Sequence, residues 1–144
     1  MAITHSPGLK AANLNAGFAP QFPQNSQLLI YSGAKPATAD LAPVGTVLAT
    51  FTLGAAPPFP AITSPTAVLT LAGVPIAVAA SVTGTAGWFR LQTAVDGGST
   101  NNTDKRLDGT VTGTGGGGDL TFDNPAFVAG QMINLTGFSY THAA

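Results

Sequence analysis

The chain contains no cysteine and no glutamate, and charged side chains are scarce throughout. Its 144 residues include five Lys or Arg and six acidic residues, all of which are Asp. From Leu41 to Phe89 it runs 49 residues without any charged side chain. Few residues are therefore available for acid–base, metal or thiol chemistry, and few charges repel neighbouring proteins. Both deficits favour a protein that functions by binding other proteins.

The missing features also argue against several other classes. The formal net charge is −1 and no basic cluster exceeds Lys105-Arg106, so we expect no nucleic-acid binding. Without Cys there are no disulfides and no thiolate metal sites. The apolar stretch from Ala67 to Val82 is interrupted by Gly73 and Pro75 and is shorter than the roughly 20 residues that cross a bilayer. We therefore expect no membrane segment there, and the N-terminus lacks the pattern of a signal peptide.

Strand and turn residues replace the usual helix formers. The chain has 24 Ala, 19 Thr, 18 Gly and 11 Pro, a mixture typical of short strands separated by turns. Apolar and polar residues alternate in several short segments, as in half-buried strands. We predict strands within 28–31, 47–53, 68–71, 76–82, 88–95, 107–112, 120–122 and 133–140, the last with a bulge at Gly137.

These segments predict an all-β fold, an antiparallel β-sandwich or barrel of about eight short strands without an amphipathic helix. Residues 27–144 are expected to form this single domain. Residues 1–26 have no sustained periodicity and contain Pro7, Pro20 and Pro23, so we predict an extended N-terminal arm. Because this arm also contains Leu14, Phe18 and Phe22, a partner subunit is a plausible anchor for it. Deletion of residues 1–26 should then leave a folded domain with an assembly defect.

No catalytic or cofactor site is predicted. The only candidate bases, His5 and His142, lie near the chain ends, where catalytic geometry is hard to maintain. Calcium could bind the loop residues Asp96, Asp104, Asp108 and Asp123, but ordinary turn chemistry explains them better. The run 115–118 is four glycines without the Lys of a phosphate loop, so we predict a flexible hairpin or a close backbone approach.

Trp88 and Arg90 share one face of a predicted strand, which leaves two interpretations open. The guanidinium could stack locally on the indole, or the pair could anchor an interface, because Trp and Arg are enriched in binding hot spots. The candidate partner contacts are Leu14, Phe18, Phe22, Trp88 and Arg90.

Several segments, in their order along the chain, resemble a family of small virion proteins of tailed bacteriophages. They include LIYSGAKPATAD at 29–40, GTVLA at 45–49, GTAGWFRL at 84–91, DGTV at 108–111, GDL at 118–120, VAGQ at 128–131 and GFSYT at 137–141. The resemblance implies a β-rich structural component with no catalytic residues. The Pro-rich segment 57–65 and the loop 99–106 look longer than the family pattern, and the residues before 27 fall outside it.

From this resemblance we expect a non-enzymatic virion protein, made in the host cytoplasm and located on the capsid surface. It would act as a decoration or cement protein that binds the major capsid protein or other virion subunits, and it is expected to form a homo-oligomer. One alternative is a tail, neck or collar component. Another is a carbohydrate-binding module for host attachment, with Trp88 or Tyr140 as the stacking platform.

Overall fold

The computed structural model describes residues 6, 9, 13–62 and 68–141, and its secondary structure is mostly β, with 38% strand and 8% helix. This confirms the all-β prediction. Two short helical elements, η1 (Leu14–Phe18) and η2 (Ala19–Gln21), precede the strands. The described residues form ten strands: β1 (Gln27–Ser32), β2 (Val47–Thr52), β3 (Val68–Thr70), β4 (Ile76–Ala79), β5 (Gly84–Gln92), β6 (Arg106–Gly113), β7 (Leu120–Phe122), β8 (Ala126–Phe127), β9 (Met132–Leu135) and β10 (Ser139–Thr141).

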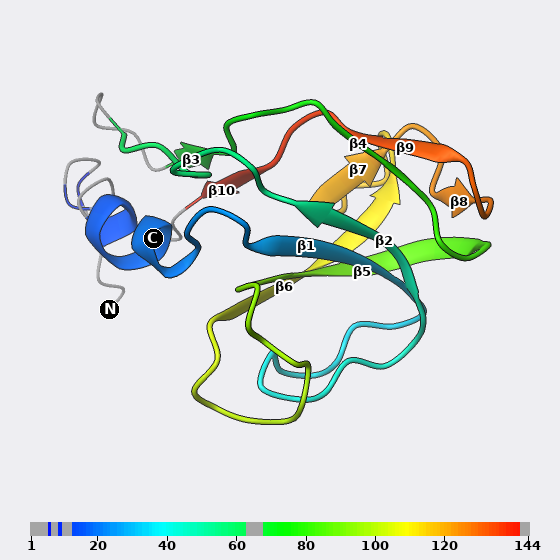
Figure 1. Cartoon of the computed structure of the whole chain (residues 1–144), viewed down its shortest axis with the longest axis horizontal. Helices are drawn as coiled ribbons and strands as arrows, with labels where there is room; N and C mark the ends of the chain where they lie inside the picture. Colours follow the sequence, from blue (N-terminus) through cyan, green and yellow to red (C-terminus); the bar gives the residue numbers. More distant parts are fainter. Residues whose placement is uncertain (1–5, 7–8, 10–12, 63–67, 142–144) are drawn as a thin grey trace.

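The main sheet has the strand order β2-β1-β5-β6-β7, with β8 paired to the start of β5, and it curls into a half-barrel. Above it in Figure 1 lies a second layer, in which β4 pairs with β9 and β3 with β10, both antiparallel. These two pairs follow each other along the same two chain segments, and we refer to them together as the ribbon. Two loops, 33–46 and 93–105, lie on the opposite side of the sheet from the ribbon (Figure 1).

The main hydrophobic core lies between the curled sheet and the ribbon. Alternate residues of the sheet strands point into it, among them Ile30, Phe51 and Phe89. The ribbon contributes Leu69, Ile133 and Leu135, and Phe138 follows in the connection to β10. Ile133 and Phe138 are both buried, as predicted, but no bulge within one strand produces this. The chain instead leaves its pairing with β4 and begins another with β3.

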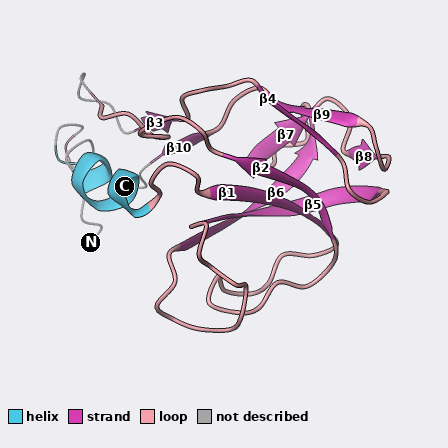
Figure 2. Cartoon of the chain, in the orientation of Figure 1, coloured by secondary structure: helices cyan, strands magenta, loops and turns pink. Residues whose placement is uncertain are grey.

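The N-terminal segment differs from the prediction. Residues 14–21 are helical rather than extended, and they lie beside the β3 and β10 end of the ribbon (Figure 2). Leu14, Ala19 and Phe22 belong to the main hydrophobic core. Asn15 fixes the segment further, because its side chain donates to the Ile62 carbonyl at 3.1 Å and accepts from the Ile62 N–H at 2.7 Å. Local Pro-rich sequence concealed a helical turn that long-range contacts stabilise.

The connection between β6 and β7 also corrects the prediction. These strands pair in parallel, so the glycine run 115–118 is not a hairpin between antiparallel neighbours. Gly115 and Gly117 have φ of +85° and +79°, which favour glycine, and they let the chain reverse twice within a short loop. A Cβ on Gly116 or Gly118 would lie 2.8 or 2.9 Å from atoms of Thr112, which confirms the predicted close backbone approach.

Candidate functional site

The charged residues are distributed very unevenly over the described part of the chain. Those that the structure describes lie on β5, on β6, beside β7 and in the two loops on the far side of the sheet. The segment 13–22 and the ribbon strands β3, β4, β9 and β10 carry none. We call these two parts together the uncharged layer. It is a candidate interaction surface because it lacks the charges that usually keep a protein surface solvated.

Small and polar uncharged side chains cover the outside of this layer. Ala77 and Ala79 are exposed on β4, and Met132 and Asn134 are exposed on β9. Met132 keeps 57% of its accessible surface. Exposed apolar residues also occur in the loops beneath the sheet, where Val95 is 91% exposed, so apolarity alone does not distinguish the layer. The layer differs from these loops in that it carries no charged residue, whereas the loops contain Lys35, Asp40, Asp96, Asp104 and Lys105.

Two of the few charges are also removed from the surface, because they form a buried ion pair on the other face of the sheet. Arg90 on β5 stands directly opposite Asp108 on β6, and Nε and Nη2 each donate to a carboxylate oxygen at 2.7 Å. The two side chains are 0% and 3% exposed. The guanidinium carbon also lies 5.5 Å from the Trp88 ring centre, and Tyr31 stacks on that ring at 4.3 Å. Burial raises the pKa of Tyr31.

A second arginine holds the loops against this face. Arg106 donates to both Asp96 carboxylate oxygens, at 2.5 and 2.7 Å, and to Asp104 at 3.2 Å. It also donates to the carbonyls of Asp40 and Ser99, which come from the two different loops. The polar segment around Ser99 is therefore folded over the sheet rather than being a free loop tip. Arg106 acts as a structural link between β6 and both covering loops.

The predicted interface residues Trp88 and Arg90 are placed inside the subunit. Both are 0% exposed, so neither side chain is available to a partner in this conformation. Their arrangement matches the other interpretation, local stacking of the guanidinium on the indole, which the structure confirms. The burial comes from the loops folding over the sheet face, which no pattern in the strand itself could reveal. Trp88 also cannot serve as a carbohydrate platform.

The three predicted contacts in the N-terminal segment are partly enclosed by their own chain. Leu14 and Phe22 are 1% and 3% exposed. Phe18 is half-buried and stacks on Tyr140 with ring centres 4.2 Å apart and the planes only 5° from parallel. One face of the Tyr140 ring is thus covered by an aromatic ring from this chain. The spacing of four residues between the apolar side chains at 14, 18 and 22 is the helical signal that could have been used.

The aspartates take part in internal contacts. Asp96 accepts from the Gly98 N–H at 2.8 Å, as a turn residue does. Asp119 accepts from the N–H and hydroxyl of Thr110, and Asp123 from the hydroxyl of Thr114. Within the described residues, no three His, Cys, Asp or Glu side chains are grouped so as to hold a metal ion. His5 and His142 lie outside the described residues.

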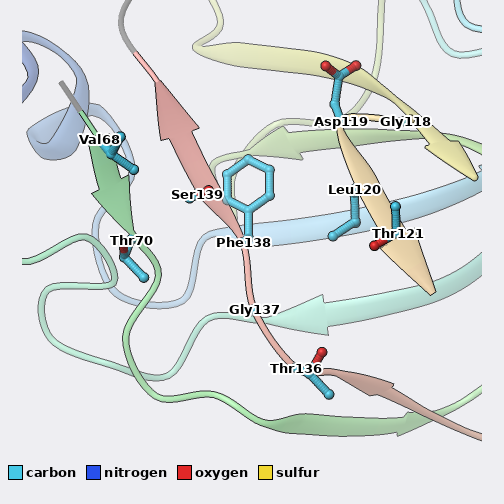
Figure 3. A pocket seen from close by; sticks show the side chains of 10 residues that line it. All are labelled: Val68, Thr70, Gly118, Asp119, Leu120, Thr121, Thr136, Gly137, Phe138 and Ser139. Atoms are coloured by element: carbon cyan, nitrogen blue, oxygen red, sulfur yellow. The ribbon is translucent and has the colours of Figure 1, made fainter. Parts of the chain in front are cut away.

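A line of hollows runs between β7 and the β9–β10 side of the ribbon. Thr121 and Thr136 border two of them. A third hollow continues the line between β6 and β10, and it shares Asp119, Phe138 and Ser139 with the first. In Figure 3, β7 with Leu120 and Thr121 lies on one side of the 136–139 segment and β3 on the other. Sheet pairing does not close this gap among the described residues. We call it the open seam.

Comparisons with protein-family profiles, with curated proteins and with solved structures find no match to this chain. Among the described residues, no helix is long and apolar enough to span a membrane.

The Arg106–Asp96 contact predicts how stability depends on pH. The hydrogen bond from Arg106 holds the pKa of Asp96 below its usual value. A lowered folded-state pKa stabilises the fold above the unfolded pKa of about 4, and this contribution is lost as the pH falls through the lower folded value. The pKa of Asp119 is also lowered, through its bonds to Thr110, and acts in the same direction. We therefore expect Tm to fall steeply below about pH 4.

Thermal unfolding between pH 2 and 7 should show a smaller acid-dependent fall in Asp96→Asn than in the wild type, since this variant lacks the titrating group. Asp123→Asn is the matched control, because Asp123 is exposed and bonds only a threonine hydroxyl. Equal acid dependence in the wild type and Asp96→Asn would contradict the assignment.

Proposed function

We propose that this protein is a non-enzymatic structural component of a tailed-phage virion that decorates and stabilises the capsid. The observation that carries the proposal is the uncharged layer, in which none of the described residues of the segment 13–22 or of the ribbon strands is charged. Such a side is poorly suited to permanent exposure and well suited to contact with other subunits. The sequence resemblance to small phage virion proteins supplies the kind of assembly.

The buried ion pairs strengthen this proposal. Arg90, Asp108, Arg106 and Asp96 have side chains no more than 3% exposed, so they contribute little to solvation of the surface. The surface is therefore poorer in charge than the composition suggests. Affinity for neighbours would come from apolar and main-chain contacts, which salt screens weakly. The major capsid protein is the proposed partner, and copies of this chain would also contact one another.

The location of the protein tests this proposal against its alternative, a tail, neck or collar component. Heads and tails of purified particles are separated and analysed by mass spectrometry for this chain. The proposal requires the chain in the head fraction, at many copies per head. Recovery in the tail fraction alone would establish the alternative. Release of the protein by moderate salt alone would contradict a contact dominated by uncharged groups.

A pair of alanine substitutions tests which side of the molecule binds. Ala79 is exposed on the uncharged layer and Ala94 is exposed in the loop beneath the sheet. Ala79→Lys should weaken binding to capsids that lack this protein by about tenfold or more, because an unpaired charge would be buried at the contact. Ala94→Lys should change it little. Equal binding by both folded variants, measured by co-sedimentation, would exclude the layer around β4 as the contact.

A further inference from the structure

We propose that the open seam between β7 and β9–β10 is a binding site for an extended segment of another protein, which adds as a β-strand. The inference rests on the proposed function only for the identity of that protein as another virion subunit. At the other edge of the main sheet, the ribbon is hydrogen-bonded to β2, because the Ser81 N–H donates to the Leu48 carbonyl at 2.8 Å. The seam is where β7 ends the main sheet.

Two chain segments border the seam, and we call them its banks: β7 on one side, and β9 with the start of β10 on the other. The β7 bank presents main-chain groups to the seam. The Phe122 carbonyl accepts from the Thr114 N–H at 3.1 Å, so the main chain of Phe122 faces β6. Main-chain groups of successive strand residues point to opposite edges of the strand. The N–H and carbonyl of Thr121 therefore point away from β6, and Thr121 borders two of the hollows of the seam.

The β9–β10 bank has the same property. Ala80, just after β4, donates to the Gln131 carbonyl and accepts from the Gly130 N–H, both at 2.8 Å. Every second pair along the antiparallel β4–β9 ladder has the same geometry. The main-chain groups of Val78 therefore point toward Ile133, and those of Ile76 point toward Leu135. Asn134 between them points its main-chain groups to the other edge, which borders the seam.

The two banks run antiparallel. Residues 118–121 lie across from 136–139, and residues 121–124 lie across from 131–134. The adjoining hollows measure about 450 and 380 Å³. Buried apolar side chains, Leu120, Phe122, Ile133 and Phe138, form part of the lining, and threonines occupy the banks. A strand inserted here would place alternate side chains toward the apolar lining and would hydrogen-bond to the banks.

The charges of the seam define the inserted strand further. Asp119 and Asp123 border it, and none of the residues lining these hollows is Lys or Arg. An acidic segment would be repelled. The ligand is therefore an extended segment with alternating apolar residues that is uncharged or carries Lys or Arg. Because recognition goes through main-chain groups along a line of hollows, a compact small molecule fits this site less well.

The experiment uses the full chain and an array of overlapping twelve-residue peptides that cover the other structural proteins of the same virion, together with this chain's own sequence. Affinity for the strongest peptide is measured by fluorescence anisotropy with the wild type, Thr121→Pro and Thr121→Val. Proline removes the outward N–H of an exposed edge residue, whereas valine keeps it. We expect Thr121→Pro to weaken binding about tenfold or more and Thr121→Val to change it less than about threefold.

Asn134→Pro, on the opposite bank, serves if Thr121→Pro fails to fold by circular dichroism. Hydrogen exchange should show protection of the Thr121 and Asn134 amides by the bound peptide. Full binding by a folded proline variant without that protection would overturn the proposal, as would binding only by peptides of this chain, which would indicate exchange between copies. If capsids bind the wild type and Thr121→Pro equally, the seam proposal fails alone. If capsids do not bind the wild type while a peptide does, the capsid proposal fails alone.

Discussion

Replacing Asp108 with asparagine should lower the free energy of unfolding by about 3–5 kcal/mol, because it leaves the Arg90 guanidinium buried without a counter-charge. Both Arg90–Asp108 hydrogen bonds are 2.7 Å long and the two side chains are almost completely enclosed. For a domain of this size, the loss corresponds to a fall in Tm of roughly 10 °C or more. Thermal denaturation followed by circular dichroism measures it directly.

The double variant Arg90→Met/Asp108→Leu should recover most of this stability. Arg90 Nη1 and Trp88 Nε1 are buried without a hydrogen-bond partner among the described residues, so the polar cluster is not fully satisfied. Replacing a buried ion pair by apolar side chains of similar size is often neutral or stabilising. Asp123→Asn, at an exposed position, is the control and should change Tm little. A single variant as stable as the wild type would show that Arg90 is not held in a closed environment.

The N-terminal segment gives the second large effect. Phe22→Ala should cost about 3–5 kcal/mol, as expected for a fully buried aromatic residue. Phe22 is 3% exposed, and its ring centre lies 5.1 Å from that of Phe18 and 6.5 Å from that of Phe59. By the same argument, deletion of residues 1–26 should destabilise the domain itself, which revises the expectation drawn from the sequence. Urea unfolding of each variant measures the loss.

Gln21→Ala is the matched control, because Gln21 is exposed in the same helical segment. It should unfold at nearly the same urea concentration as the wild type. A Phe22→Ala protein with unchanged stability but a defect in capsid binding would contradict the packed segment. It would support instead an arm that reaches a neighbouring subunit.

The strands were largely predictable because their apolar residues alternate and Gly or Pro separates them. β1, β2, β6 and β7 lie close to the predicted segments. β5 begins at Gly84, earlier than the predicted start at Trp88, and β8 was not predicted at all. β8 has only two residues, too few for periodicity to show. β5 begins with glycine, threonine and alanine, which carry little apolar signal.

The packing of loops, strands and the N-terminal segment against one another was harder to predict from the sequence. Burial of Trp88 and Arg90 depends on two loops that Arg106 connects from positions far apart in the sequence. The helical packing at 14–21 depends on Asn15 bonding to Ile62 and on Phe18 stacking against Tyr140. The parallel pairing of β6 and β7 depends on a glycine loop that reverses the chain twice. Each is a long-range or loop-specific feature that local alternation does not encode.

The scarcity of charge, in contrast, was visible in the sequence, and the fold shows where the uncharged runs of the chain lie. The uncharged run from Leu41 to Phe89 supplies β2, β3 and β4, and a second run after Asp123 supplies β8, β9 and β10. The β3–β10 and β4–β9 pairings bring these two runs together in the ribbon. Together with the segment 13–22, the uncharged layer is therefore built from three separate parts of the chain, which makes it a property of the fold as well as of the composition.

The central claim is that neighbouring subunits cover the uncharged layer in a virion. An electron cryomicroscopy map of the intact particle tests it most directly. The account predicts density for this chain on the head shell, with β4 and β9 facing other subunits and the loops 33–46 and 93–105 facing outward. A map with the protein on the shell but with the ribbon exposed to solvent would contradict the account, and so would a map in which no part of the particle holds the chain.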